Sequence, residues 1–495
     1  MKRVGSTFIP PITIDSRKKR PIYGQLYDWL RAAITEGTMK PGQRLPSTRS
    51  MAAELKISRI SVFNAYEQLQ SEGYLETFVG SGTCVAKAIP DETVGSSVGH
   101  GGRPRQVTVG SAPRRVSARA SALLKVASEP WLHNLGAFRV SLAALDYFPV
   151  NPWSKLVTRH ARQQSRASMA YGDAMGYLAF REAISEYLGT FRSVRCDASQ
   201  ILITSGSQQA LQICAQVLLD PGDQLLIEEP GYPGARLAFT SAGVQLVPVP
   251  VDNDGMITER ISRRRAAVYV TPSHQYPLGM TMSAARRMSL LKWAIHSGSW
   301  IIEDDYDSEY RFSSRPIASL QGLDTDSRVI YIGTFSKVLF PALRLGYVVV
   351  PKDLIPVFST ARDAADIFSP TLYQAVLGDF IREGHLARHV RRMRMLYMDR
   401  RKTLVNTIRT HLGTSVEVIG DDAGMHLVVL LPPGVDDMLV SKDAAQNGIS
   451  AMPLSSCYMK PHGRSGLILG YGGVSPRQIH EGMSKLAAIV KRVAR

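Results

Sequence analysis

Lys337 stands shortly after a run of strand character and beside small hydroxyl residues. The apolar residues 329–332 are followed by Thr334, Ser336 and Lys337, and Arg344 comes seven residues after the lysine. A lysine that forms a Schiff base must be fixed in place and partly desolvated, so that its amine is neutral often enough to attack a carbonyl. The hydroxyl groups and the arginine are groups that could hold a phosphate. Taken alone, however, the same pattern fits a surface lysine beside a loop.

Further residues that could bind a ligand follow other apolar runs. Ser207 and Gln208 come after Ile203-Thr-Ser-Gly206, a sequence typical of a strand-to-helix junction. Free backbone N–H groups and the helix dipole favour a phosphate at such a helix N-terminus. Tyr232 follows the next run and offers an aromatic face to a planar ring.

A segment rich in carboxylates ends another apolar run. Asp304, Asp305 and Tyr306 follow residues 300–302. A buried carboxylate in contact with a pyridine nitrogen keeps that nitrogen protonated, which makes the ring an electron sink. An aspartate at a strand end also often caps a helix, and an aromatic residue can simply pack. The ordered set of candidates is nevertheless far less expected by chance than any one of them.

These residues need a scaffold that brings strand ends together. From Tyr171 onward, helical patterns over residues 176–187 and 207–219 alternate with apolar runs. The runs predicted as strands are 225–227, 267–270, 300–302, 329–332 and 347–350. Continuous apolar strands separated by helices favour an α/β fold with a mostly parallel sheet covered on both faces. In such sheets ligands bind at the carboxyl ends of the strands, where the polar candidates collect.

The first part of the chain predicts a different kind of unit. Apolar residues fall at helical spacing over residues 22–36, and Ser47 and Ser58 can cap helices over residues 48–55 and 59–73. Two short helices joined by a few residues form a helix-turn-helix. Strand-like segments on either side of residues 79–82 then predict a hairpin, or wing.

Residues 22–86 resemble a GntR-type winged helix-turn-helix domain. The residues that carry the resemblance are Leu45-Pro-Ser-Thr-Arg49, Leu55-x-Ile57-Ser58-Arg59-x-Ser-Val62, Ala65-Tyr66-x-x-Leu69, Gly73-Tyr74-Leu75 and Gly80-Ser-Gly82-Thr83. The resemblance implies DNA contacts from Arg49, Arg59, Ser61 and Gly82. Ile60 departs from the polar residue often found at its position, which suggests apolar base readout there, for example of a thymine methyl group. The alternative is a small helical protein-interaction module.

Residues 130–495 resemble the fold-type I aminotransferases, which use pyridoxal 5'-phosphate, from the Tyr171-Gly-Asp-x-x-Gly176 stretch onward. The resemblance implies Lys337 as the Schiff-base lysine, Asp304 on the pyridine nitrogen, Tyr306 on the phenolic oxygen and Tyr232 stacked on the ring. The residues implied around the phosphate are Ser207, Gln208, Thr334, Ser336 and Arg344, with Tyr171 reaching it from the other subunit. Asp304 is preferred to Asp305 because Tyr306 follows two residues later.

Two departures from the aminotransferase pattern bear on chemistry. Tyr276-Pro-Leu-Gly279 stands where those enzymes carry Asn-Pro-Thr-Gly, so that His274 or Gln275 would have to replace the asparagine. Ile468 stands where they place an arginine that clamps the substrate carboxylate; Arg464 and Arg236 are the candidate replacements. Efficient transamination is therefore not expected.

The amino-acid composition bears on the partners and the cellular compartment of the protein. The 495 residues carry a net charge of +17, which invites a polyanionic partner such as nucleic acid. Four cysteines lie far apart, and neither CxxC nor zinc-like histidine spacing occurs, so no metal site is expected. No apolar stretch approaches the roughly 18 residues that span a bilayer, and the N-terminus lacks a secretion signal. We expect a cytoplasmic protein without a membrane partner.

The whole chain is similar to the MocR/GabR family of bacterial transcription regulators. The expected domains are a GntR-type DNA-binding domain (15–88), a flexible linker (89–125) and an aminotransferase-like domain (126–495). The resemblance implies a homodimer that binds double-stranded DNA at paired half-sites and senses pyridoxal phosphate, an amine or an amino acid, without being an enzyme. The alternatives are a working aminotransferase with a DNA-binding appendage and a dimerisation scaffold without cofactor.

Overall fold

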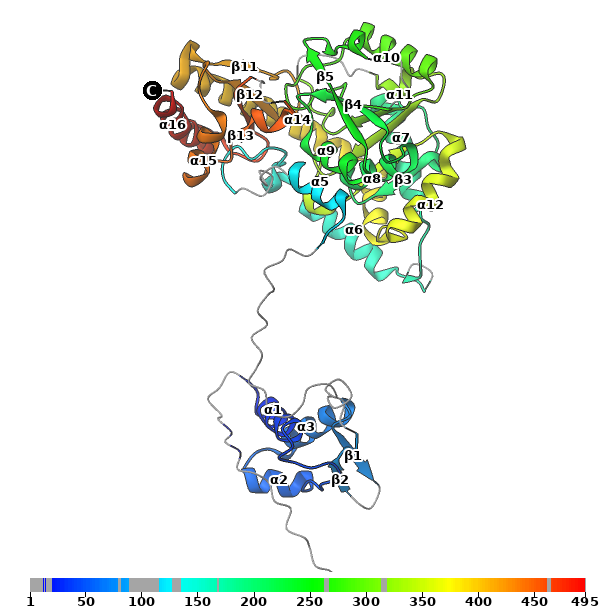
Figure 1. The fold of residues 1–495 in the computed structure, drawn as a ribbon, viewed down its shortest axis with the longest axis vertical. Helices are drawn as coiled ribbons and strands as arrows, with labels where there is room; N and C mark the ends of the chain where they lie inside the picture. The colour runs from blue at the N-terminus through cyan, green and yellow to red at the C-terminus, as the bar shows by residue number, and fades with distance from the viewer. Residues whose placement is uncertain are drawn as a thin grey trace, which may run out of the picture. The chain divides into compact units, whose positions relative to one another are not determined.

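The computed structural model describes residues 12, 14, 20–78, 82–88, 115–126, 135–166, 169–261, 267–312, 318–460 and 464–494. The chain divides into two compact units, Met1–Pro113 and Arg114–Arg495 (Figure 1). Most of the predicted linker lies outside the described residues. Its last residues belong to helix α5 (Ala118–Val126), which packs against α9 (Pro233–Ser241) of the larger unit.

In its described part, the smaller unit consists of a helical bundle followed by a hairpin (Figure 1). Its elements are α1 (Ile22–Thr35), α2 (Thr48–Leu55), α3 (Arg59–Ser71), β1 (Leu75–Phe78) and β2 (Gly82–Val85). Both predicted caps are confirmed, because Ser47 Oγ accepts from the N–H of Ser50 and Ser58 Oγ from that of Ser61, each at 3.1 Å. The two strands pair antiparallel, and the tip of the predicted wing lies outside the described residues.

The larger unit is built around an eight-stranded sheet with the strand order β3-β10-β9-β8-β7-β4-β5-β6. The strands are β3 (Ile201–Thr204), β4 (Gln224–Glu229), β5 (Gln245–Asp252), β6 (Gly255–Met256), β7 (Ala267–Val270), β8 (Ile301–Asp305), β9 (Val329–Thr334) and β10 (Gly346–Val349). The pairs from β5 to β9 are parallel, whereas β10 runs antiparallel to β9 and to β3, and β6 antiparallel to β5. The mostly parallel sheet is confirmed.

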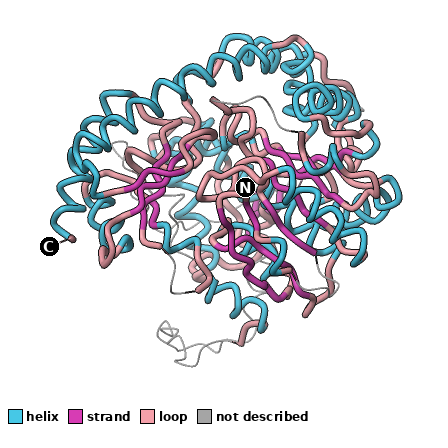
Figure 2. The backbone as a smooth tube through the Cα atoms, turned by 90° about the horizontal axis from the view of Figure 1, so that it is seen from above, coloured by secondary structure: helices cyan, strands magenta, loops and turns pink. Residues whose placement is uncertain are grey.

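Helices cover both faces of this sheet (Figure 2). The alternation along β7 shows why, since Tyr269 packs with α8 and α9 on one face while Val268 and Val270 pack with α10 on the other. The remaining helices are α6 (Val150–Arg162), α7 (Leu178–Arg192), α8 (Ser207–Leu218), α10 (Ala284–Ser297), α11 (Leu320–Leu323), α12 (Ile355–Asp366) and α13 (Thr371–Arg382). Burial on two faces explains the continuous apolar sequence of the strands.

A smaller antiparallel sheet follows in sequence, with the order β11-β12-β14-β13. Its strands are β11 (Glu417–Ile419), β12 (His426–Leu430), β13 (Met452–Pro453) and β14 (Gly466–Gly470), and the helices are α14 (His385–Leu412), α15 (Asp437–Gln446) and α16 (Pro476–Val493). In Figure 2 the two sheets are separate groups of strands with helices beside them. Across the described ranges, every helix is too short or too polar to cross a lipid bilayer.

Candidate cofactor pocket and DNA-binding surface

A cavity of about 270 Å³ lies at the carboxyl ends of the central strands. Nine of the ten predicted cofactor residues line it, namely Ser207, Gln208, Tyr232, Asp304, Tyr306, Thr334, Ser336, Lys337 and Arg344. The lining residues that the sequence analysis missed as cofactor contacts are Arg139, Val140, Ser141, Leu142, Tyr269, Thr271, Tyr276 and Pro341. The fold therefore gathers residues from several strand ends into one site.

Lys337 lines this cavity just beyond the end of β9. The turn that carries it is fixed locally, because the N–H of Ser336 donates to Thr334 Oγ1 at 3.2 Å. Desolvation lowers the pKa of Lys337 to about 8, although the nearby carboxylates of Asp307 and Asp304 favour its charged form. At pH 7 about a tenth of this lysine is therefore an uncharged nucleophile, far more than for a lysine with the ordinary pKa.

Asp304 is the next-to-last residue of β8, and within the described part of the chain one of its carboxylate oxygens is hydrogen-bonded while the other is not. Its Oδ2 accepts a hydrogen bond from the Tyr269 hydroxyl at 2.8 Å, while its buried Oδ1 has no hydrogen-bond partner among the described residues. Burial raises the pKa of Asp304 to about 7. A buried carboxylate oxygen of this kind suits a protonated ring nitrogen, which would satisfy it.

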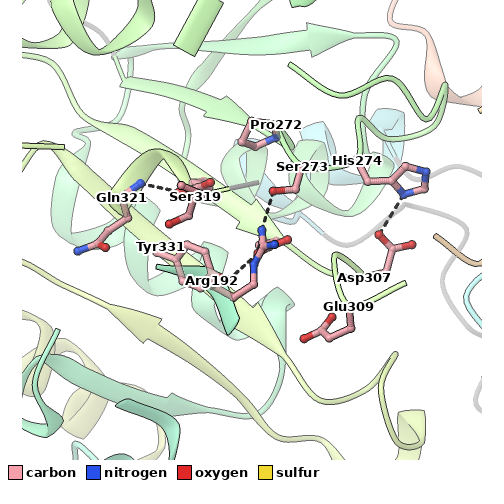
Figure 3. A network of polar contacts seen from close by, with 12 residues as sticks. Arg192, Pro272, Ser273, His274, Asp307, Glu309, Ser319, Gln321 and Tyr331 are labelled. Atoms are coloured by element: carbon pink, nitrogen blue, oxygen red, sulfur yellow. Dashed lines mark hydrogen bonds and ion pairs between the residues drawn. The ribbon is translucent and has the colours of Figure 1, made fainter. Parts of the chain in front are cut away.

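Asp305 points to a different partner. Arg192 Nε donates to Asp305 Oδ2 at 2.7 Å, and the Tyr331 hydroxyl donates to the same oxygen at 2.6 Å. Figure 3 shows Arg192 pointing toward Ser273, whose hydroxyl accepts a further hydrogen bond from Arg192 Nη2 at 2.8 Å. Of the two aspartates, Asp304 lines the cavity and Asp305 does not, while the role of Asp304 on a ring nitrogen stays a prediction.

Another part of the cavity lining combines a helix N-terminus with an arginine and hydroxyl groups. Helix α8 begins at Ser207, directly after Gly206 with φ of +97°. A Cβ at Gly206 would lie 3.2 Å from the guanidinium carbon of Arg344, so glycine lets this arginine approach the start of the helix. The buried Ser336 Oγ lacks a partner among the described residues. Helix N–H groups, a guanidinium and an unpaired hydroxyl together suit a phosphate.

Aromatic residues also line the cavity. Tyr232 lies edge-on to Tyr276, with ring centroids 5.3 Å apart. A Cβ at Gly234 would lie 2.5 Å from the Tyr232 ring, so this ring position requires the glycine. The Tyr306 hydroxyl donates to the carbonyl oxygen of His274 at 2.9 Å and also lies 3.0 Å from its Nδ1.

Neither residue proposed to replace the missing asparagine lines the cavity. The Gln275 side-chain amide donates instead to the carbonyl oxygens of Pro230 and Tyr276. His274 is buried and bonded through Nδ1 to Asp307 at 3.0 Å (Figure 3). His274 therefore contacts Tyr306 without lining the cavity, whereas Tyr276 lines it. The same histidine lies with Asp307 and His426 in a buried group whose polar atoms are within 4.8 Å of one another.

The two arginines considered as carboxylate clamps also lie elsewhere. Arg464 is exposed and pairs with Glu417 at 2.9 Å. Arg236 donates to the carbonyl oxygens of Tyr458 and Ser456. Ile468 is fully buried in β14, in an apolar cluster that includes Val140 and Tyr276.

Arg139 is the arginine besides Arg344 that lines the cavity. Its charge is close enough to Lys337 to lower the pKa of that lysine. Arg139 could not be identified from the sequence, because it lies before α6 in a segment without helical or strand periodicity. Tyr171 is the predicted residue outside the cavity; its side chain is 82% exposed and contacts Phe368 edge-on.

The predicted DNA contacts lie on the surface of the smaller unit. Arg49 is exposed on α2, while Arg59 and Ser61 occupy the first turn of α3. Arg59 Nε reaches Thr48 Oγ1 at 3.4 Å, which places the starts of the two helices together. Gly82, with φ of +82°, begins β2 and is exposed.

Comparison with known proteins gives matches to both units. Residues 22–85 match the family of bacterial regulatory proteins named gntR, and residues 142–481 match aminotransferase class I and II. The chain is 40% identical to the probable rhizopine catabolism regulatory protein MocR of Rhizobium meliloti, over 96% of this chain and 95% of that protein. It is 30% identical to the pyridoxine biosynthesis transcriptional regulator PdxR of Corynebacterium glutamicum, over 93% and 94% of the two chains.

A solved structure supports the fold of the larger unit. Alpha-aminoadipate aminotransferase LysN of Thermus thermophilus, complexed with N-(5'-phosphopyridoxyl)-L-leucine, matches with a TM-score of 0.68 and 27% identity, over 76% of this chain and 95% of that chain. The predicted fold class is thereby confirmed. Because both domain types match in one chain, along nearly the full length of regulators, this protein belongs to the MocR-type family of transcriptional regulators, in which a GntR helix-turn-helix domain is joined to an aminotransferase-like domain.

Proposed function

We propose that the larger unit binds pyridoxal 5'-phosphate at Lys337, and that the state of this lysine controls DNA binding by the smaller unit. The observation that carries the proposal is a pair of buried, unpartnered polar atoms, Asp304 Oδ1 and Ser336 Oγ, on residues that line one cavity with Lys337. Buried polar groups without a partner are rare and call for a ligand that satisfies them. The ring nitrogen and the phosphate of pyridoxal phosphate do so.

Different lining residues would hold different parts of the cofactor. Asp304 would hold the ring nitrogen, Tyr306 the phenolic oxygen and Tyr232 one ring face. The groups assigned to the phosphate are Ser207, Gln208, Thr334, Ser336 and Arg344. When bound, the cofactor supplies an aldehyde carbon that is electrophilic toward amines, and Lys337 supplies the uncharged amine that its lowered pKa makes available.

An effector would act by taking the place of Lys337. The released Nζ, with a pKa of about 8, can then take up a proton beside the carboxylates of Asp304 and Asp307. Arg139 in the cavity favours an effector amine that also carries a carboxylate or another acidic group, since a guanidinium pairs with such groups. The larger unit would transmit this change in the charge and contacts of Lys337 to the DNA-binding unit.

The site favours sensing over turnover. The asparagine position is filled by Tyr276, and the position of the carboxylate-binding arginine by the buried Ile468. The relatives compared over their full length are named regulators. Steady turnover of an amino donor and a 2-oxo acid, with kcat on the order of 1 per second or above, would instead favour the aminotransferase alternative.

The DNA-binding unit would act in pairs. The exposed Tyr171 fits a residue that a homodimer would place at the phosphate of the partner subunit. A homodimer carries two winged domains, which suits paired half-sites on double-stranded DNA. The domain boundaries proposed are 15–88 for the DNA-binding domain, 89–125 for the linker and 126–495 for the effector domain, except that residues 118–125 of that linker belong to α5, which packs against the effector domain. Such a protein would work in the cytoplasm, where the DNA is.

Borohydride trapping tests the cofactor assignment. Purified protein is incubated with pyridoxal phosphate, reduced and digested, and the peptides are analysed by mass spectrometry. We expect the phosphopyridoxyl mass on the peptide that contains Lys337, in wild type and in the control Lys352→Ala, whose lysine is 72% exposed and pairs with Asp197. Lys337→Ala should carry no such label. Wild-type protein without label at Lys337 would contradict the proposal.

A further inference from the structure

Helix α3 exposes two large apolar side chains next to each other. Ile60 is 71% exposed and Phe63 is 51% exposed. Residues three positions apart lie on the same face of a helix. The opposite face, with Val62, Ala65 and Leu69, is buried in the core of the smaller unit. The fold of this unit therefore does not use the exposed pair.

The basic residues near this pair lie on its N-terminal side. Residues 40–59 contain five Lys or Arg residues and one acidic residue, whereas residues 60–86 contain no Lys or Arg and three Glu. Arg59 is the first residue of α3, at the end where the helix dipole is also positive, and the other four basic residues precede the helix in sequence. Arg59 lies directly beside Ile60, and its contact with Thr48 brings the start of α2 to the same place. An apolar pair bordered by cations fits a polyanion that also presents apolar groups.

DNA meets this description in its major groove. Thymine alone among the four bases carries a methyl group there, and apolar side chains contact it. Phosphates on either side of the groove suit the neighbouring arginines. Asn64, exposed in the same turn, could bond the adenine of a T·A pair, since asparagine bonds adenine N6 and N7.

We propose that Ile60 and Phe63 read thymine methyl groups, so that each half-site of the operator contains thymine at the positions these side chains reach. This inference rests on DNA binding by the smaller unit and deepens it, because it names the base that the recognition helix selects. It assigns specificity to apolar contact rather than to hydrogen bonds.

Replacing thymine by uracil tests this inference, because it removes the methyl group alone. The full-length protein, with pyridoxal phosphate, is used to enrich duplexes from a random pool. The enriched duplex is then synthesised with dU in place of dT at one position at a time. At the contacted positions we expect the Kd to rise about fourfold, the value for one buried methyl-sized group. Other thymines should be insensitive.

Substitutions connect the effect to the two side chains. Ile60→Ala and Phe63→Ala should each bring the ratio of Kd for dU and dT to about one at its own position. Tyr23→Ala, an exposed aromatic on α1, is the matched control and should leave the ratio unchanged. Arg49→Ala should weaken binding to both duplexes alike. Because all four positions are exposed, the variants should melt close to the wild-type temperature.

Four results would overturn the inference. A wild-type ratio near one at every thymine would show that no methyl group is read. A ratio that survives in both alanine variants would assign the reading to other residues. Variants that bind DNA normally but change the oligomeric state would show that this face docks a protein. Failure of the wild type to enrich any duplex would count against DNA binding itself, and this inference would fall with it.

Discussion

Asp304→Asn is predicted to stabilise the protein without cofactor while weakening the cofactor site. Burial raises the pKa of Asp304 from its ordinary value of 3.8 to about 7. Keeping this carboxylate charged in the folded protein at pH 8 therefore costs on the order of 4 kcal/mol, because each tenfold change corresponds to about 1.4 kcal/mol. Asparagine avoids that cost and can still accept a hydrogen bond from the Tyr269 hydroxyl, which now lies 2.8 Å from Asp304.

The sign of the pH dependence follows from the raised pKa. Between about pH 4 and pH 7 the unfolded aspartic acid releases its proton and the folded one keeps it, so wild-type stability falls as the pH rises. Urea unfolding of the cofactor-free proteins should show the variant more stable by up to about 4 kcal/mol at pH 8. The difference should disappear toward pH 4.

Cofactor binding should change in the opposite direction. A hydrogen bond to a charged group contributes about 1.5–3 kcal/mol, so pyridoxal phosphate should bind the variant roughly ten- to hundredfold more weakly. Fluorescence titration measures this affinity. A variant that is less stable than wild type at pH 8, or that binds the cofactor as tightly, would refute the role of Asp304.

Three further variants test other parts of the structure. Asp305→Asn should lower stability by about 3–5 kcal/mol in urea unfolding, since it leaves the buried Arg192 without its charge partner; an unchanged midpoint would contradict the pairing. Ser58→Ala should lower the stability of the smaller unit by about 0.5–2 kcal/mol, because it removes the cap of α3, whereas calorimetry should show the larger unit unaffected. In wild type we expect glycine to displace Lys337 about tenfold more readily than methylamine, and Arg139→Gln should abolish this preference. Absorption titration measures the displacement, and a preference kept in the variant would exclude Arg139 as the group that binds the carboxylate.

Local features of the fold were predictable from the sequence. Ser47 and Ser58 cap their helices as predicted, because a cap depends only on a hydroxyl and the next few backbone N–H groups. The apolar strands were identified for a similar reason, since burial on both faces leaves a continuous apolar run. The predicted strand at residues 329–332 continues to Thr334, as polar residues at a strand end give no pattern.

Contacts between distant segments could not be predicted in the same way. Successive residues of a strand point to opposite faces, so only one of Asp304 and Asp305 can face the cavity, and the sequence favoured Asp304 only through its spacing from Tyr306. From the sequence, Tyr269 is an ordinary buried strand residue. Its hydrogen bond to Asp304 depends on the pairing of β7 with β8. Arg139 reaches the cavity from a segment that has no periodicity. The replacement of an asparagine by Tyr276 was visible, but the position of His274 behind Tyr306 was not.

The most direct test of the central claim is the DNA affinity of the full-length protein as a function of the state of Lys337. A duplex enriched from a random pool is titrated with wild type and with Lys337→Ala, each without cofactor, with pyridoxal phosphate, and with pyridoxal phosphate and glycine. We predict that the wild-type Kd differs between these conditions and that the Lys337→Ala Kd does not. Equal responses of the two proteins, or no response of the wild type, would contradict control of DNA binding through this lysine.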